Sequence, residues 1–143
     1  MSAGAASTSR LRTSSGGVVR GGVRGVVRFA LAALFIASGT GHFVRSEFFT
    51  AIMPPWLPWP LALVWISGFL EIAGAIALLV PATRRAAGIG LIALMVGVFP
   101  ANVHMALHSD AFPHFAPWLL WLRLPLQGVL IALAWWCSSR DRQ

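Results

Sequence analysis

The sequence predicts an all-α membrane protein, folded as a four-transmembrane-helix bundle with both termini in the cytoplasm. The first observation is composition: 57% of the 143 residues are hydrophobic, 10% are charged, and the mean hydropathy is +0.76. Soluble domains average about 25% charged residues. The second is a series of four apolar stretches, each near the length of about 20 residues that spans a bilayer. The third is the placement of the arginines on alternate sides of these stretches.

The elements follow in order along the chain. Residues 1–25 are rich in serine, glycine and alanine, carry four arginines, and predict a disordered basic cytoplasmic tail. Residues 26–137 form the predicted transmembrane domain, and residues 138–143 form a short cytoplasmic C-terminus. Pro60 and Pro117 suit the first turns of helices, where the missing N–H costs little. The four spans are predicted at about residues 26–43, 61–80, 86–107 and 117–137.

The arginines predict the orientation of the spans. Five lie in the tail and at the start of the first span, two in the turn over residues 81–85, and two at the C-terminus, nine in all. The connections on the opposite side, residues 44–60 and 108–116, hold only Arg45. Because arginine is retained on the cytoplasmic side of a membrane, the termini and the short turn are predicted to lie inside. The two other connections, which are rich in tryptophan, phenylalanine and proline, are predicted to lie outside.

Several classes of function are disfavoured by the composition. The net charge of +7 does not indicate a nucleic-acid-binding protein, because the basic residues flank the spans instead of forming a stripe on a soluble domain. The single cysteine, Cys137, excludes an internal disulfide or a C-x-x-C redox centre. His104 and His108 lie four residues apart but complete no zinc spacing, so no metal site is predicted. No catalytic residue and no intrinsic cofactor are predicted, and enzyme activity stays an open question.

Each predicted span carries polar residues that hydrocarbon disfavours. Such residues normally face the interior of the bundle, so we predict one polar pocket in its outer half. Glu71 and Arg123 are predicted to form a buried ion pair there, since both side chains lean toward the outer ends of their helices. The alternative is that this pair only fixes the register of the helices. The pocket residues are His42, Glu71, Asn102, Arg123 and Gln127, with Ser38, Ser67, Trp65 and Trp121 as further candidates for its lining.

Proline and small residues add to this expectation. Pro100 and Pro125 each free a backbone carbonyl inside a span, and such carbonyls are tolerated where they line a polar cavity. We therefore expect the pocket to open outward between the helices. Close helix packing is expected at small residues four apart, namely Ala33, Ala37 and Gly41 in the first span and Ala93 and Gly97 in the third.

Six short motifs lie along the spans and their connections. They are Gly41-His42-Phe43, Ile52-Met53-Pro54-Pro55-Trp56-Leu57-Pro58, Ser67-Gly68-Phe69-Leu70-Glu71-Ile72-Ala73-Gly74, Arg84-Arg85, Val98-Phe99-Pro100-Ala101-Asn102 and Trp121-Leu122-Arg123-Leu124-Pro125-Leu126-Gln127. With these motifs the chain resembles the DoxX-like membrane proteins over about residues 29–137. The resemblance implies a four-helix, multi-pass protein of the bacterial inner membrane.

The resemblance also implies a class of function. The family takes its name from a subunit associated with an archaeal thiosulfate:quinone oxidoreductase, and other relatives are linked to redox homeostasis or to the maturation of periplasmic enzymes. It thus implies an oxidoreductase-associated protein with quinone as a bound cofactor. An oxidoreductase or periplasmic protein is the implied partner, in addition to the lipid bilayer. The chain lacks the cysteine pairs of thiol-active relatives, so direct disulfide chemistry is not expected.

Three functional hypotheses follow. In the first, the chain is a membrane subunit of an oxidoreductase, in which Arg123, His42 and Asn102 bind the quinone carbonyls and Glu71 relays a proton. In the second, it is a non-catalytic scaffold or assembly factor for a partner complex. In the third, it is a small proton-coupled transporter with Glu71 as the proton site. The third is disfavoured because four spans without an inverted repeat do not resemble a transporter.

The orientation predicts the outcome of reporter fusions. A reporter fused after Arg85 or at the C-terminus should read cytoplasmic, and one inserted within residues 44–60 should read external, because of the distribution of arginine. The measurement is paired alkaline phosphatase and fluorescent-protein activity in cells. A cytoplasmic reading from residues 44–60 would overturn the orientation.

Overall fold

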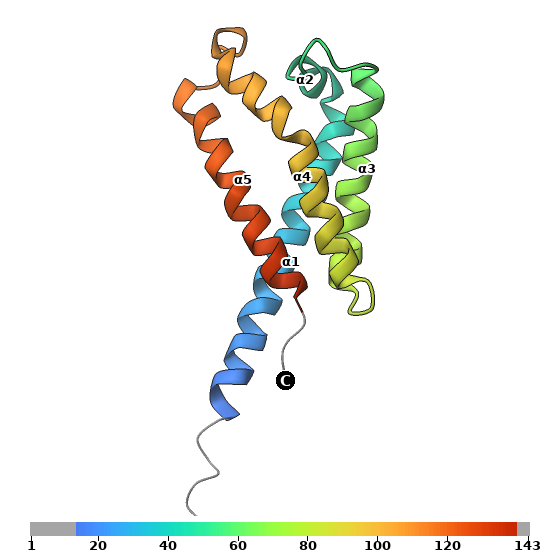
Figure 1. Cartoon of the computed structure of the whole chain (residues 1–143), viewed down its shortest axis with the longest axis vertical. Helices are drawn as coiled ribbons and strands as arrows, with labels where there is room; N and C mark the ends of the chain where they lie inside the picture. The colour runs from blue at the N-terminus through green and yellow to red at the C-terminus, as the bar shows by residue number, and fades with distance from the viewer. Residues whose placement is uncertain (1–13, 140–143) are drawn as a thin grey trace, which may run out of the picture.

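The computed structural model describes the backbone of residues 14–139 and the side chains of residues 22–139. This part of the chain is helical, without β-strands. It contains four long helices. Figure 1 shows the short helix α2 at one end of the bundle. The elements are α1 (Ser14–Val44), α2 (Ser46–Ala51), α3 (Pro60–Leu79), α4 (Arg84–Leu107), the 3-10 turn η1 (Ser109–Ala111) and α5 (Pro117–Ser138).

The four long helices confirm the predicted all-α fold of four helices that could span a membrane. Each contains a segment long and apolar enough to cross a membrane. Pro60 and Pro117 occupy the first turns of α3 and α5, as their missing N–H groups predict. These membrane-spanning segments are Gly22–Val44, Pro60–Leu79, Arg84–Leu107 and Pro117–Ser138.

The start of α1 differs from the sequence prediction. The predicted disordered tail covers residues 1–25, but residues 14–25 are helical, and residues 1–13 lie outside the described part of the chain. Extending a helix that already exists avoids the cost of nucleation, and each added residue gains one hydrogen bond. The extension is also held by tertiary contacts. The Arg24 guanidinium lies 5.1 Å from the ring centre of Trp136 on α5.

The helices form two closely packed pairs, α1 with α3 and α4 with α5. In Figure 1, α4 and α5 lean away from α1 and α3 toward the end that carries α2. We call this end of the bundle the α2 end. Helix α5 contacts α1 at the opposite end, where Arg28 donates a hydrogen bond to the carbonyl of Cys137 (3.1 Å).

Two apolar clusters lie at the two ends of the bundle. The cluster opposite α2 joins all four long helices and includes Leu31, Phe35, Leu78, Leu91 and Cys137. The cluster at the α2 end joins α4, α5 and the segment that follows α2. It consists of Ile52, Ala101, Met105, Ala106, Phe112 and Leu120, with Phe48, Phe49, Met53 and Leu124 packed against it. Between these clusters lies the polar part of the bundle.

A glycine contact sets the distance between α1 and α3. A Cβ atom added to Gly39 would lie 2.7 Å from the carbonyl oxygen of Gly68, and one added to Gly68 would lie 2.7 Å from the Cβ of His42. The two backbones therefore touch, and this contact holds His42 against α3. Small residues at helix interfaces permit such an approach in membranes.

The predicted packing positions are wrong in detail. Three of them, Ala33, Ala37 and Ala93, are exposed on the outside of the bundle. Gly97 is exposed too, but it lines the cavity described below and meets no neighbouring helix within 4 Å. Spacing by four residues identifies a stripe of small side chains but not the side of the helix that meets a neighbour. In α1 the buried stripe runs instead through Leu31, Ala32, Phe35, Gly39 and His42.

The Gly39 contact can be tested by substitution. Gly39→Ala should destabilise the protein by about 1–3 kcal/mol, because the new methyl group meets backbone atoms that cannot move aside easily. The matched control is Gly90→Ala, where nothing lies within 4 Å and stability should rise slightly, by at most about 1 kcal/mol. Thermal unfolding in detergent measures both. Equal behaviour of the two variants would contradict a tight α1–α3 contact.

Candidate functional site

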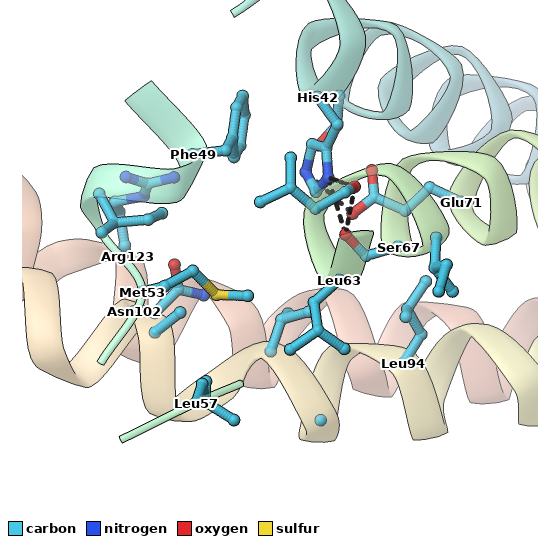
Figure 2. Close-up of a pocket in the computed structure, with 17 residues that line it drawn as sticks. His42, Phe49, Met53, Leu57, Leu63, Ser67, Glu71, Leu94, Asn102 and Arg123 are labelled. Atoms are coloured by element: carbon cyan, nitrogen blue, oxygen red, sulfur yellow. Dashed lines mark hydrogen bonds and ion pairs between the residues drawn. The ribbon is translucent and has the colours of Figure 1, made fainter. Parts of the chain in front are cut away.

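A cavity of about 330 Å³ lies between the two helix pairs. Figure 2 shows α1 and α3 on one side, α4 and α5 on the other, and α2 with the following segment beside them. The lining is mostly apolar, and its polar members come from all four long helices. These polar residues are Ser38, His42, Ser67, Glu71, Asn102 and Arg123.

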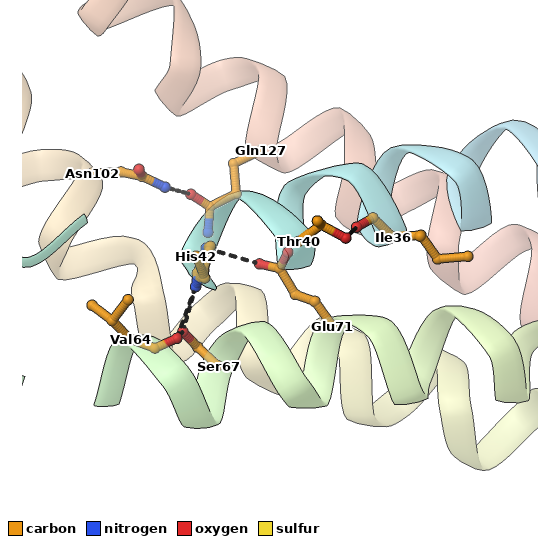
Figure 3. A network of polar contacts seen from close by, with 8 residues as sticks. All are labelled: Ile36, Thr40, His42, Val64, Ser67, Glu71, Asn102 and Gln127. Atoms are coloured by element: carbon orange, nitrogen blue, oxygen red, sulfur yellow. Dashed lines mark hydrogen bonds and ion pairs between the residues drawn. The ribbon is translucent and has the colours of Figure 1, made fainter. Parts of the chain in front are cut away.

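On the α1–α3 wall, His42 is held by two contacts through one ring nitrogen. Its Nδ1 lies 3.0 Å from the carbonyl oxygen of Val64 and 2.8 Å from Oγ of Ser67, as Figure 3 shows. The Ser67 hydroxyl donates to the same Val64 carbonyl (2.9 Å). A carbonyl oxygen only accepts hydrogen bonds, so Nδ1 must carry a proton and act as the donor. The other ring nitrogen, Nε2, takes no part in these contacts.

That second nitrogen is turned toward Glu71. The Nε2 atom of His42 lies 3.8 Å from Oε1 of Glu71, and both residues are more than nine-tenths buried. The distance suits an ion pair but is too long for a direct hydrogen bond. The other carboxylate oxygen, Oε2, is buried and has no hydrogen-bond donor in the described part of the chain. Glu71 lines the cavity, but its Oε2 atom is enclosed by the protein and does not itself open onto the cavity.

On the α4–α5 wall, Asn102 and Gln127 form a second network. The side-chain nitrogen of Asn102 donates to Oε1 of Gln127 (2.8 Å), and Gln127 in turn donates to the carbonyl of Met95. Gln127 is 6% exposed and stands behind the cavity wall. It therefore orients Asn102 but does not itself line the cavity.

Arg123 supplies the positive charge of the cavity. One of its terminal nitrogens donates to Sδ of Met105 (3.1 Å). A thioether is a weak acceptor, so this contact uses little of the capacity of a guanidinium with five N–H donors. No carboxylate of the described residues forms an ion pair with Arg123. The guanidinium is thus available to a ligand with an acceptor group.

The predicted ion pair between Glu71 and Arg123 is wrong. Glu71 faces His42 across the α1–α3 contact, and Arg123 lies on the opposite wall. The prediction compared the depths of the two residues, but depth does not identify which helices are neighbours. The Gly39–Gly68 contact brings α1 against α3, and the nearest partner for Glu71 is then His42.

The other predicted residues divide into two groups. Ser38, Ser67 and Asn102 lie around the same cavity as His42, Glu71 and Arg123. Trp65 and Trp121 do not line it, because their side chains lie on the outside of the bundle and are 48% and 52% exposed. They are half-exposed aromatic side chains on spans, which is where lipid would contact them.

The prolines also face away from the cavity. Pro100, Pro125 and the residues whose carbonyls they free, Val96 and Trp121, are all exposed. None of these four residues lines the cavity, so the expectation that the freed carbonyls line it is wrong. Both prolines lie on the outer surface of the bundle, so the polar character of the cavity comes from side chains.

Sequence analysis missed the α2 side of the cavity. Phe49 of α2 packs on the His42 ring with 4.0 Å between ring centres, and Met53 and Leu57 complete this side. His104 contacts the carbonyl of Ile52 through Nδ1 (3.2 Å) and thus ties this segment to α4. The signal in the sequence was the pattern Phe48, Phe49, Ile52, Met53, which has the spacing of one helical face.

His104 and His108 stack with 4.2 Å between their ring centres. The described residues contain no group of three or more His, Cys, Asp or Glu side chains that could hold a metal ion.

A family model described as Domain of unknown function (DUF8561) matches residues 31–138, which cover most of the chain and all the cavity residues. No curated protein matches the chain. No solved structure matches it either.

The revised pairing predicts a specific pattern of energetic coupling. In a double-mutant cycle, His42→Phe and Glu71→Gln should couple by at least about 0.5 kcal/mol, because the two side chains interact directly. Glu71→Gln and Arg123→Met should add to within about 0.5 kcal/mol, since they stand on opposite walls. Free energies of unfolding in detergent supply the measurement. Strong coupling of Glu71 to Arg123 with none to His42 would restore the original pairing.

Proposed function

This chain belongs to the DUF8561 family, and we propose that it is a membrane subunit or accessory of a quinone-linked oxidoreductase or redox-homeostasis system. The proposal places it in the bacterial inner membrane, with the α2 end facing outward. The cavity between the helix pairs is the proposed binding site for the quinone head group. The observation that carries the proposal is the pairing of apolar walls with polar groups on two opposite sides.

The chemistry of a quinone suits such a cavity. Its ring is flat and apolar, and it carries oxygen atoms on two opposite edges. Small-molecule sites are commonly apolar pockets of about 300–1,000 Å³ with a few polar groups that fix the orientation. The cavity is near the lower end of this range, at about 330 Å³. Arg123 offers N–H donors on one wall, and the His42–Glu71 pair faces it from the other.

The cavity is also accessible to a ligand dissolved in the membrane. Ile66 of α3 lines it and is 56% exposed, and Gly97 of α4 lines it and is exposed as well. The cavity thus reaches the outer surface of the bundle between α3 and α4. A head group entering here would leave its hydrocarbon tail against the apolar surface that lipid covers.

Within the proposed complex, the chain would bind and orient the head group. The contacts of Arg123 and His42 hold these two side chains at fixed positions on opposite walls. An oxidoreductase or periplasmic partner protein would exchange electrons with the bound quinone. The proposal therefore rests on ligand binding by the described residues, and it assigns no catalytic residue to this chain.

Photolabelling tests the proposal. A quinone analogue with a photoreactive group should label wild-type protein on the peptides of α3 and α4 that line the cavity. Arg123→Leu should reduce the labelling about tenfold or more, because a charge-assisted hydrogen bond is lost. Arg85→Leu is the matched control, since Arg85 is exposed at the end of the bundle opposite α2. Both variants are first checked for normal folding by size-exclusion chromatography and thermal unfolding.

Two results would contradict the quinone site. One is equal labelling of wild type and Arg123→Leu, and the other is labelling confined to the region of Val80 and Ala86. If a partner protein co-purifies in place of quinone, the chain acts as a scaffold or assembly factor.

A further inference from the structure

We infer that the cavity binds a head group that carries a negative charge, and that Arg123 is the residue that selects for this charge. For the proposed quinone this means an acidic hydroxyquinone, whose ring hydroxyl ionises and leaves a charged oxygen. The inference rests on the proposed quinone site and adds the charge of its ligand.

The observation behind it is that Arg123 has no counter-charge. The residue lies on α5, within a segment apolar enough to span a membrane, and it is partly buried and lines the cavity. Its guanidinium donates to the thioether of Met105 (3.1 Å), and no carboxylate of the described residues lies within ion-pair distance. A charge inside a membrane is costly unless a group of opposite sign compensates it. A ligand with a negative charge would supply that group.

The negative charge of the cavity, in contrast, is compensated within its own wall. Oε1 of Glu71 lies 3.8 Å from Nε2 of His42, and Ser38 forms a hydrogen bond with the same carboxylate. Oε2 is enclosed by the protein. Both partners belong to α1, so the carboxylate is directed at the α1–α3 contact and not across the cavity at Arg123. The carboxylate therefore has partners inside the protein, whereas the guanidinium does not.

Asn102 adds a second donor on the wall of Arg123. Its amide nitrogen carries two hydrogens and gives one of them to Gln127 (2.8 Å). Figure 2 shows Asn102 and Arg123 on the α4–α5 side of the cavity, away from His42. A neutral carbonyl could accept hydrogen bonds from both side chains, but it would leave the charge of Arg123 uncompensated. The charge of the ligand is therefore the property that this wall distinguishes.

Binding of two matched probes tests the inference. They are 2-hydroxy-3-decyl-1,4-naphthoquinone, at a pH at which its hydroxyl is ionised, and 2-methyl-3-decyl-1,4-naphthoquinone, which is neutral and of similar size. Equilibrium dialysis measures both with the full chain in phosphatidylcholine nanodiscs, and empty nanodiscs give the baseline. Wild type should bind the hydroxyquinone about tenfold more tightly or better, because a pair of opposite charges forms in a membrane-embedded cavity.

Three variants locate the charge that is responsible. Arg123→Gln keeps an N–H donor but removes the charge, so the two affinities should fall within about threefold of each other. Arg123→Lys keeps the charge and should retain the preference, and it provides a second test should Arg123→Gln fail to fold. The matched control is Arg45→Gln, which removes an exposed charge at the α2 end outside the cavity lining and should leave the preference unchanged.

The outcomes separate the two proposals. If neither probe binds above the nanodisc baseline, both the quinone site and its charge preference are wrong. If wild type binds both probes equally, the charge preference is wrong and the quinone site stands. The same conclusion follows if Arg123→Lys loses the preference, or if Arg45→Gln loses it as Arg123→Gln does.

An anionic phospholipid is the other source of a negatively charged head group. Nanodiscs in which phosphatidylglycerol replaces part of the phosphatidylcholine distinguish it, each with matched empty nanodiscs as the baseline. If both probes stay bound to wild type, the occupant is a hydroxyquinone, as inferred. If phosphatidylglycerol displaces both probes from wild type but not from Arg123→Gln, the charge preference stands with a lipid phosphate as the occupant, and the quinone site is wrong.

Discussion

The contact between the backbones of Gly39 and Gly68 is the constraint on which the polar site depends. It brings α1 and α3 so close that no side chain fits between them at this level. His42, one turn along α1, is then pressed against α3, where Val64 and Ser67 fix its ring. The imidazole leaves one nitrogen facing Glu71. A wider separation would remove the ring from its partners and leave a carboxylate alone in hydrocarbon, which is costly.

The α4–α5 wall of the cavity is held by hydrogen bonds of amide side chains. Asn102 donates a hydrogen bond from α4 to Gln127 on α5, and Gln127 donates to the backbone carbonyl of Met95. Apolar clusters at both ends of the bundle hold the two pairs of helices together, and they enclose the polar residues between them. Arg123 lines the cavity and keeps hydrogen-bonding capacity that the described residues do not use. Glu71 also lines the cavity, but its unpartnered Oε2 atom is enclosed by the protein.

The fold followed from the sequence because its physical basis is local. The lengths of the apolar stretches predicted all four spans closely. Pro60 and Pro117 also marked the starts of two of them, because a proline without an N–H group is tolerated in the first turn of a helix. The polar residues of the cavity could also be predicted from the sequence. A charged side chain such as Glu71 or Arg123 is costly to expose to hydrocarbon, so it faces the interior in any helix bundle. The α2 helix was missed because it is short and lies in a connection that aromatic residues made resemble an interfacial loop.

The partners of each residue could not be read from the sequence. Pairing depends on which helices are neighbours and on how each is rotated, and these follow from contacts between distant segments. Gly39 and Gly68 form the contact that makes α1 and α3 neighbours. The sequence around them, however, does not distinguish these two buried glycines from the exposed residues Gly97 and Ala37. The same limit explains Trp65, whose neighbour Ile66 lines the cavity while the indole lies outside.

We propose that the cavity holds a membrane-soluble quinone, and native mass spectrometry of the gently solubilised protein would detect it. The spectrum should show a mass increment of one quinone-class molecule on each chain, retained at low collision energy and identified by its fragments. Protein that carries only phospholipid, or a stable partner chain with no quinone, would contradict it.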